Sequence, residues 1–457
     1  VNYSITNATF PDVLKKSHVT PIYKSGLKCD ISNYRPISIL PILSKIFERH
    51  LVNQLTFYFN SFNLLSCKQF GFRAGMSTSD AVAELAENVY NSLDGKLYHI
   101  NVFVDFRKAF DTVNHSILLS KLNSYVVRGL ANDYIRSYLC DRQQCVRIGD
   151  SFSSNRSINI GVPQGSLMGP LLFLIYINDL PNCFNFVKSV LYADDTCFSF
   201  AHSDFNTLVD TFNDELELFR KWTIDSRLSV NMDKTFFMLI SNKSAVFNSE
   251  SLLFFGGEAV KMKSSEKYLG VIMDNRFSFS EHIRHIRSKV AKSTGIMYRL
   301  RNFVSPVTLK NLYYCLVYPY LIYCNLIWGA TSNCHLRNLD LIQKKIIRII
   351  SYSDYLAHTS PLFCKLEILK IADIHAYLLS IYMFKKNILL QIDTANHDYE
   401  TRFRSNLLTT FRRLTVTQRS LSYLGPRLWN ALPKTIRSAN SLTIFKRKVR
   451  EYFINCY

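Results

Sequence analysis

The chain has 457 residues, of which 48% are hydrophobic and 20% are charged. This balance is ordinary for globular proteins and argues against a disordered, collagen-like or coiled-coil chain. The 55 Lys and Arg residues against 35 Asp and Glu give a formal net charge of +20, which favours polyanionic partners, nucleic acid before an anionic membrane. Residues 401–457 contain twelve of the basic residues and one acidic residue, so this end either contacts phosphates or is a solvated basic tail.

The eleven cysteines include no CxxC pair, which indicates reduced thiols in an intracellular protein. The first residue is Val1 and the opening run is polar, so we expect no signal peptide and interpret the chain as a fragment or a processed piece. Residues 311–336 carry no charge and are long enough to span a bilayer. Pro319, Asn311 and Asn325 nevertheless favour a buried helical pair over a membrane span.

The first 280 residues alternate between helical and strand-like patterns. Apolar residues at helical spacing predict a helix over 41–60, and Ser77 or Ser79 is placed to cap a second helix that ends near residue 93. The β-branched and aromatic run 100–106 predicts a buried strand. The other elements expected here are a helix from about residue 114, a hairpin over 144–160 around Gly149–Asp150, an apolar helix over 165–178, strands at 189–192 and 196–200, a helix over 204–224, and strands near 235–241 and 267–273.

Beyond about residue 280 the hydrophobic spacing is helical. We therefore expect mixed structure over 1–280, mostly helical structure over 281–400, and a basic tail in which Gly425–Pro426 forms a turn. The fold class that these elements predict is α+β.

Two short acidic sites follow strand-like runs. Asp105 ends one run, and Asp194–Asp195 stand between two expected strands. Adjacent acids are common by chance, and an isolated Asp at a strand end is usually a cap or an ion-pair partner. Here both sites would lie at one edge of a sheet, where three carboxylates need cations. Mg²⁺ takes ligands from one or two carboxylates and from substrate phosphates, and two such ions about 3.5–4 Å apart activate a hydroxyl and stabilise a leaving pyrophosphate.

Seven sequence blocks surround these acids in a fixed order. They are YRPISILPILSKIFER (34–49), QFGFRAGMST (69–78), FVDFRKAFDTVNH (103–115), GVPQGSLMGPLLFLIYINDLP (161–181), YADD (192–195), LSVNMDKT (228–235) and YLGVIMD (268–274). In residue sequence and in order, these blocks resemble the reverse transcriptases of non-LTR (LINE-type) retrotransposons, most of all the jockey-type group. The resemblance covers about residues 15–275 and is weaker beyond them.

The resemblance implies a right-hand polymerase that extends a primer 3′-hydroxyl with dNTPs on an RNA template by two-metal phosphoryl transfer. Asp105 and Asp194 would hold two Mg²⁺ ions, with Mn²⁺ as an alternative, and Asp195 would support the metal site or the primer end. Phe110 would be a steric gate that occupies the space of a ribose 2′-hydroxyl; a plain core position is the alternative. Asp111 matches a further acid of the family that is more structural than metal-binding.

The same resemblance implies residues that bind the nucleotide. Gln164 and Gly165 would lie against the incoming nucleotide and the template base. Arg35, Lys45 and Arg73 would reach its triphosphate, since Arg and Lys neutralise phosphate charge; each alone is more often a surface charge.

Two further roles and the domain layout also follow from the resemblance. Lys234 would protonate the leaving pyrophosphate, and Tyr268–Leu269–Gly270 would form the hairpin that grips the primer. The expected parts are an N-terminal extension with the fingers over 1–100, a palm with an antiparallel sheet and finger insertions over 101–280, a helical thumb and connection over 281–400, and a mostly helical basic C-terminal region over 401–457.

The partners implied are an RNA template, a DNA primer or target and dNTPs, with no membrane. In the cell the reaction would be target-primed reverse transcription, which requires nuclear access, and the endonuclease of the jockey-type group would lie upstream of this chain. A catalytically silent or host-adopted relic that acts as an RNA-binding protein is the alternative, because intact motifs do not establish a working enzyme.

Overall fold

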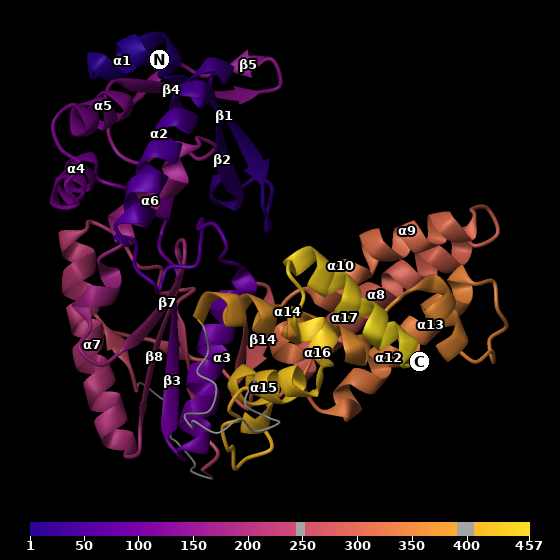
Figure 1. Cartoon of the computed structure of the whole chain (residues 1–457). Coiled ribbons are helices and arrows are strands. Elements are labelled where there is room, and N and C mark those ends of the chain that lie inside the picture. Colours follow the sequence, from indigo (N-terminus) through magenta and orange to yellow (C-terminus); the bar gives the residue numbers. More distant parts are fainter. Residues whose placement is uncertain (244–251, 391–405) are drawn as a thin grey trace.

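The computed structural model describes residues 1–243, 252–390 and 406–457, and of Ser32 and residues 387–390 it describes only the backbone. The fold is mixed α+β. An N-terminal part, a central sheet and an arm of helices follow one another in space (Figure 1). The boundary expected between residues 400 and 401 lies outside the described residues.

The N-terminal part combines a small sheet with helices. Strand β1 (Lys16–Tyr23) pairs antiparallel with β2 (Tyr34–Ile39) and parallel with β4 (Arg142–Ile148), and β4 also pairs with β5 (Ser151–Phe152) and β6 (Arg156–Ile158). The helices of this part are α1 (Asn2–Thr6), α2 (Ile42–Ser61), α4 (His115–Ser124), α5 (Leu130–Leu139) and α6 (Met168–Ile177). The sheet thus joins residues near the chain start to residues more than a hundred positions later.

The central sheet has the strand order β12-β9-β3-β8-β7. Its strands are β3 (Tyr98–Val104), β7 (Lys188–Tyr192), β8 (Asp195–His202), β9 (Phe236–Ile240) and β12 (Lys261–Met262), and all neighbours are antiparallel except β12 and β9. Helix α7 (Phe205–Asp225) covers one face and α3 (Thr78–Asp94) the other (Figure 1). Helix α3 therefore belongs to the layer of this sheet, although it precedes the boundary expected at residue 100. Two short hairpins, β10–β11 (Phe254–Phe255, Glu258–Ala259) and β13–β14 (Ser265–Tyr268, Val271–Asp274), follow the sheet.

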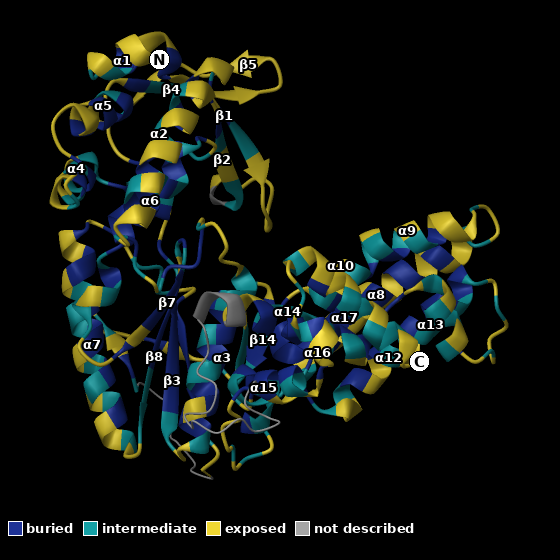
Figure 2. Cartoon of the chain, viewed as in Figure 1, coloured by how far each residue is buried: buried dark blue, intermediate teal, exposed yellow. Residues whose placement is uncertain are grey.

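The strands β3 and β9 at the centre of the sheet are almost entirely buried, and Figure 2 draws β3 and β7 mostly in dark blue. Alternate residues of a strand point to opposite faces. Val102 and Val104 of β3 lie in the core that includes α7 and α6, whereas Phe103 between them lies in the core that includes α3. A strand with two buried faces is apolar throughout, which explains why β3 could be recognised as a continuous hydrophobic run.

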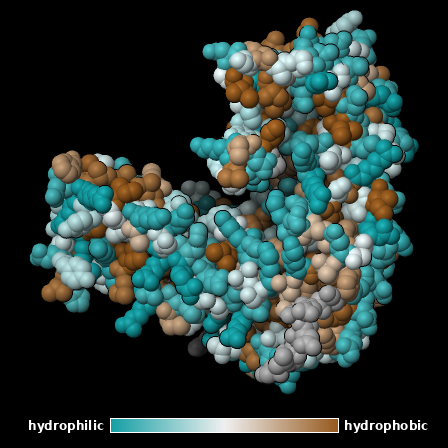
Figure 3. Space-filling model, turned by 180° about the vertical axis from the view of Figure 1, so that it is seen from behind, coloured by the Kyte–Doolittle hydropathy of each residue, from teal (hydrophilic) through white to brown (hydrophobic). Residues whose placement is uncertain are grey.

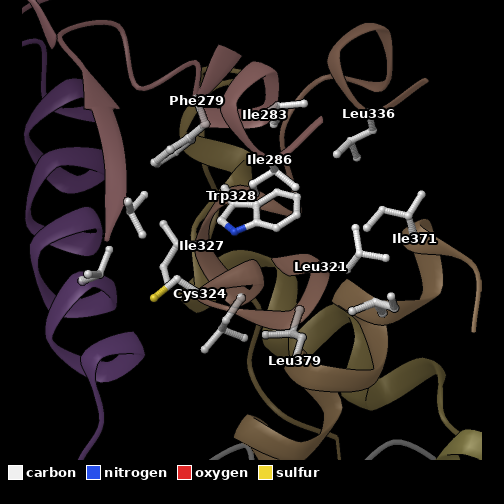
Figure 4. Close-up of a cluster of buried hydrophobic side chains, with 14 of the residues drawn as sticks. Phe279, Ile283, Ile286, Leu321, Cys324, Ile327, Trp328, Leu336, Ile371 and Leu379 are labelled. Atoms are coloured by element: carbon white, nitrogen blue, oxygen red, sulfur yellow. The ribbon is translucent and has the colours of Figure 1, made fainter. Parts of the chain in front are cut away.

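The arm is helical. Its helices are α8 (Ser280–Leu300), α9 (Pro306–Leu316), α10 (Tyr318–Ile322), α11 (Asn325–Trp328), α12 (Asn333–Ile350), α13 (Ser360–Leu366), α14 (Ile371–Leu390), α15 (Leu421–Ala431), α16 (Lys434–Arg437) and α17 (Leu442–Asn455). Trp328 is fully buried among residues of α8, α10, α12 and α14 (Figure 4). This core is continuous with the core under α3, so the arm is joined to the central sheet by hydrophobic contact.

Residues 413–422, which follow the last gap in the described residues, contact helix α3. The Glu87 carboxylate of α3 accepts hydrogen bonds from the backbone N–H of Leu421 and from the hydroxyl of Ser422. The Asp94 carboxylate accepts from the Arg413 N–H at 3.0 Å and the Thr417 hydroxyl at 2.8 Å. This segment therefore attaches the arm to the same helix that lies against the central sheet.

Most expected elements are confirmed within one to three residues. Ser77, and not Ser79, caps α3: its hydroxyl accepts from the Asp80 N–H, and the Asp80 carboxylate accepts from the Ser77 N–H at 2.9 Å. The hairpin around Gly149–Asp150 is the β4–β5 turn. The helices expected from residue 114 and over 41–60, 165–178 and 204–224 are α4, α2, α6 and α7, and the strands expected at 189–192, 196–200 and 235–241 are β7, β8 and β9.

Three expectations are corrected. The region 267–273 is a hairpin and not one strand, because Leu269 and Gly270 turn the chain between β13 and β14. Gly425–Pro426 lies inside α15 and not in a turn. A Cβ atom on Gly425 would lie 2.4 Å from the Met383 sulfur, so this glycine allows α15 to approach α14 closely. The uncharged stretch 311–336 is divided among α9, α10 and α11 and the start of α12, and is not a helical pair.

The surface is hollowed between the N-terminal part and the arm, and Figure 3 shows this cleft from behind. Among the helices of the described residues, none has the length and apolar character needed to cross a bilayer.

Candidate active site

The three predicted carboxylates converge at one edge of the central sheet. Strands β3 and β8 are antiparallel, with Val104 opposite Thr196. Asp105 follows Val104 and Asp195 precedes Thr196, so both acids lie at the same end of the two strands. Strands β7 and β8 pair through Tyr192 and Asp195, which leaves Ala193 and Asp194 as the turn between them. The sheet register therefore brings together acids that are about ninety residues apart in the sequence.

Asp105 is held by the segment that follows α7. The backbone N–H of Asn231 donates to the Asp105 carbonyl at 2.8 Å, and its side-chain Nδ2 donates to Asp105 Oδ2 at 3.1 Å. Lys234 Nζ lies 3.5 Å from the same Oδ2. Both contacts use one carboxylate oxygen, so Oδ1 has no protein partner among the described residues. Lys234 is thus placed beside Asp105.

Burial and neighbouring carboxylates raise the pKa of Asp194 and of Asp195. Burial raises the pKa of Asp194, the charge of Asp105 adds to this rise, and Arg35 and Lys24 oppose it. Asp195 keeps one side toward solvent, yet the burial of its carboxylate and the charges of Asp194 and Asp105 raise its pKa to about 6. Mutual repulsion of this kind is relieved by a cation.

The basic residues of the N-terminal part are placed differently from one another. Arg35 on β2 and Lys24, just after β1, are close enough for their charges to stabilise the ionised Asp194. Lys45 is exposed on α2 and makes no hydrogen bond or ion pair with the described residues. Arg73 donates to the carbonyls of Ser66 at 2.7 Å and Gln69 at 3.4 Å. Arg73 therefore holds its own loop in this structure.

Sequence reasoning missed Lys24, Asn231 and Gln69. Lys24 is one lysine among many, and only the pairing of β1 with β2 brings it to the cleft. Asn231 lies in a recognised block, but its contact to Asp105 crosses 126 positions. Gln69 lies in the block QFGFRAGMST and contacts the turn 193–194 across 124 positions. No local sequence signal identifies contacts of this range.

Phe110 packs against two other aromatic rings. Its ring is stacked on Phe173 of α6 at a centroid distance of 4.6 Å, and Phe72 meets it edge-on at 6.4 Å. Phe110 is half-buried, so it is part of the core and also reaches the surface. This position is compatible with a steric gate for the ribose 2′-hydroxyl and with a plain core position.

Gln164 and Gly165 are fixed against β2. The Ser38 N–H donates to the Gln164 carbonyl at 2.7 Å, and Gln164 Nε2 donates to Asp111 Oδ1 at 2.8 Å. Gly165 has a φ of +126°, and a Cβ atom there would lie 2.5 Å from the Ser38 carbonyl oxygen. Glycine is therefore required at this position. Burial raises the pKa of Asp111, and its hydrogen bond from Gln164 acts in the opposite direction.

The hairpin β13–β14 lies beside the carboxylates. Leu269 and Gly270 form its two-residue turn, both with positive φ (43° and 82°). The Tyr323 hydroxyl of the arm donates to the Leu269 carbonyl at 2.7 Å. Tyr268 is buried, and its ring meets Phe103 at 5.0 Å. The turn predicted to grip a primer is thus attached both to the central sheet and to the arm.

A cavity of about 250 Å³ opens between these elements. Its polar wall includes Asp105, Asp195, Lys234, Lys263 and Glu266, and Tyr268 closes one side. Carboxylate oxygens are the donors that Mg²⁺ prefers, and such sites are completed by substrate phosphates. Among the described residues no three His, Cys, Asp or Glu side chains form a ready-made metal cluster. Asp105 and Asp195 line this cavity, whereas Asp194 is not among its lining residues. The carboxylate oxygens of Asp105 and Asp195 are donors of the kind that a divalent cation takes.

Comparisons with known proteins identify the family of the chain. A family model described as reverse transcriptase (RNA-dependent DNA polymerase) matches residues 15–273. The chain is 29% identical over 372 residues to a probable RNA-directed DNA polymerase from transposon X-element of Drosophila melanogaster, covering 80% of this chain and 40% of the relative. It is 30% identical over 380 residues to the RNA-directed DNA polymerase from mobile element jockey of Drosophila funebris, again covering 80% and 40%. The chain thus spans about two fifths of the length of these relatives.

Solved telomerase structures show a weaker likeness. Apo telomerase from Candida tropicalis is 15% identical with a TM-score of 0.45, covering 82% of this chain and 67% of that one. The family match by itself spans more than half of the chain. The chain therefore belongs to the reverse transcriptase family, whose members are metal-dependent polymerases, and it is related to the polymerases of the jockey, X-element and BS elements.

Proposed function

We propose that this chain is the polymerase of a non-LTR retrotransposon and extends a primer 3′-hydroxyl with dNTPs on an RNA template. The observation that carries the proposal is the convergence of Asp105, Asp194 and Asp195 at one sheet edge, with Arg35 and Lys24 across from them. Carboxylates beside a basic wall are the arrangement that binds divalent cations together with a triphosphate.

The proposed roles follow from these positions. Asp105 and Asp194 would hold two Mg²⁺ ions, with Mn²⁺ as an alternative; when bound, the ions would supply positive charge to the attacking and leaving oxygens. The primer 3′ oxygen forms a bond to the α-phosphorus as the bond to the β-phosphate oxygen breaks. The hydroxyl proton passes to solvent, and Lys234 holds a proton for the leaving pyrophosphate.

The remaining site residues would position the substrates. Arg35, with Lys24 opposite Asp194, binds the triphosphate, and Gln164 with Gly165 lies against the nascent base pair. Lys45 and Arg73 would also reach the triphosphate; here Lys45 is exposed, and Arg73 donates to the carbonyls of Ser66 and Gln69. Phe110 excludes the 2′-hydroxyl, and Tyr268–Leu269–Gly270 positions the primer end.

On this proposal, the part built on β1, β2 and β4 is the fingers, the central sheet is the palm and the helical arm is the thumb with its C-terminal extension. The cleft between them would hold an RNA–DNA duplex, whose phosphates suit the net charge of +20. In the cell we propose target-primed reverse transcription, with a nicked genomic 3′ end as primer, which requires access to the nucleus.

Primer extension on poly(rA)–oligo(dT) with Mg²⁺ tests the proposal. We expect extension by the wild type and by Asp150→Asn, an exposed turn residue far from the site, and none by Asp105→Ala or Asp194→Asn. RNA binding should survive in all four proteins. If the folded wild type binds RNA and does not extend the primer, the chain acts as an RNA-binding protein and the proposal is wrong.

A further inference from the structure

The turn that carries Asp194 is not supported by the central sheet alone. Ala193, its first residue, has a φ of +57°, which places a residue with a Cβ atom in the left-handed region. This conformation costs an L-residue on the order of 1 kcal/mol and persists where surrounding contacts impose it. Strand β7 is the edge strand of the sheet, so a segment outside the sheet must supply those contacts.

The segment is the loop before α3. The Phe70 N–H donates to the Leu191 carbonyl at 2.8 Å, and the Leu191 N–H donates to the Lys68 carbonyl at 2.9 Å. Gln69 and Leu191 thus form a parallel bridge, and residues 68–71 extend the sheet beyond β7. Phe70 lies in a small core with Val190, against Tyr192 of the same hairpin.

Within this loop the Gln69 side chain reaches the turn itself. Its Oε1 accepts from the Ala193 N–H at 3.0 Å and from the Gly71 N–H at 2.8 Å. Gln69 is 1% exposed, so these bonds are shielded from water. Gly71 lies directly on the turn: a Cβ atom there would be 2.4 Å from the Ala193 nitrogen. The loop and the turn are therefore in backbone contact.

The nitrogen of the Gln69 amide argues against a purely structural role for this side chain. Its Nε2 is buried without a hydrogen-bond partner among the described residues. A buried unpartnered N–H group costs stability, so this side chain is not the choice that stabilises the fold best. What the amide supplies here is an oxygen at a fixed point beside the turn.

We propose that Gln69 is a positioning residue, which fixes the Ala193–Asp194 turn so that the Asp194 carboxylate faces Asp105. This inference rests on the proposed function and extends it. A loop outside the palm sheet would help to position one of the catalytic carboxylates. Gln69 touches neither substrate nor reacting atoms; it acts through the backbone of the turn.

The test compares Gln69→Leu with a matched control, Asn178→Leu, at the C-terminal end of α6, which contacts the start of the same loop. Asn178 is also a buried amide: it accepts from the Ser66 N–H at 2.8 Å and donates to the Leu64 carbonyl at 2.8 Å, but it does not reach the turn. We expect Gln69→Leu to lower kcat for single-nucleotide insertion about tenfold or more per folded molecule, with RNA–DNA duplex affinity unchanged. Asn178→Leu should lower stability at least as much and leave kcat unchanged.

Hydrogen exchange supplies a readout that does not need catalysis. We expect amide exchange of residues 190–196 to quicken in Gln69→Leu and to stay at the wild-type rate in Asn178→Leu. Wild-type exchange in Gln69→Leu, or an equal loss of kcat in both variants, would overturn the inference. If the wild type itself does not extend primers, the proposed function fails, and the exchange rates alone decide whether Gln69 holds the turn. If Gln69→Leu does not fold, Gln69→Met takes its place in every comparison.

Discussion

The Tyr323 hydroxyl donates a 2.7 Å hydrogen bond to the Leu269 carbonyl, and its ring fills the space that a Cβ atom on Gly270 would need. One residue of the arm therefore shapes the turn of the β13–β14 hairpin. Two-residue turns with two positive φ angles favour Asn-Gly, and Leu at the first position is unfavourable by itself. Contacts of Leu269 with Phe70, Val190 and this hydroxyl compensate for that cost.

Tyr323→Phe should weaken the binding of the primer–template. Losing one hydrogen bond of about 1 kcal/mol should raise KM for primer–template about fivefold and leave KM for dNTP unchanged. Tyr320→Phe is the control, since Tyr320 is equally exposed at 41% and makes no hydrogen bond to the hairpin. Steady-state kinetics with each substrate varied in turn would measure both constants. Equal effects of the two variants would show that the hairpin does not depend on Tyr323.

Gly165→Ala should impair nucleotide binding. The new Cβ atom would meet the Ser38 carbonyl at 2.5 Å and would disturb the neighbouring Gln164. We expect KM for dNTP to rise about tenfold or more, as small displacements of positioning groups do. Gly149→Ala at the β4–β5 turn is the control: it also has positive φ but open space around it, so it should cost about 1 kcal/mol of stability and no activity. A normal KM in Gly165→Ala would remove Gln164–Gly165 from the nucleotide site.

Phe110→Val should relax the discrimination between deoxy- and ribonucleotides. The smaller side chain opens space beside Phe173, and we expect the ratio of kcat/KM for dNTP over rNTP to fall about tenfold or more. Phe200→Val, at another half-buried position on β8, controls for lost packing. An unchanged ratio with reduced stability would make Phe110 a core residue only.

Stability should fall in mild acid because of His99. This imidazole is buried between Ser92 and Asn101, and burial lowers its pKa to about 4. The unfolded chain takes up the proton below the ordinary pKa of 6.5, whereas the native state does so only near 4. The stabilisation is therefore complete above pH 6.5 and is lost as the pH falls from 6.5 to 4.

From this residue alone we expect about 2 kcal/mol less free energy of unfolding at pH 5 than at pH 7. Urea unfolding at both pH values would measure it. His99→Gln should lose less on acidification than the wild type, while His50→Gln, an exposed position, should not differ from the wild type. An equal loss of free energy of unfolding between pH 7 and pH 5 in the wild type and in His99→Gln would contradict the expected role of His99.

Local signals in the sequence were sufficient for most elements. Ser77 and Asp80 form a capping box that can be recognised three residues apart, and β3 is apolar because both of its faces are buried. The position of Asp105 and Asp194 after strand-like runs also allowed their convergence to be predicted. These features depend on residues that are close in the chain.

The rest depended on tertiary contact. The turn at Leu269 carries no Asn-Gly signal because Phe70, Val190 and Tyr323 stabilise it from elsewhere. Gly425–Pro426 suggested a turn, but the Met383 side chain requires the glycine there for close helix contact. Whether Arg73 contacts substrate or its own loop is likewise not encoded locally, since it depends on where the Ser66 and Gln69 carbonyls lie.

The attachment of the C-terminal segment to α3 has a mechanical consequence. The arm leaves the central sheet after β14 and is bound again at Glu87 and Asp94 of α3, in addition to the hydrophobic core that joins the two parts. Helix α3 therefore packs on the central sheet and also anchors the arm, so it couples the position of the arm to the sheet. Breaking the Glu87 and Asp94 contacts would leave the arm attached through its hydrophobic contacts and the Tyr323 hydrogen bond alone.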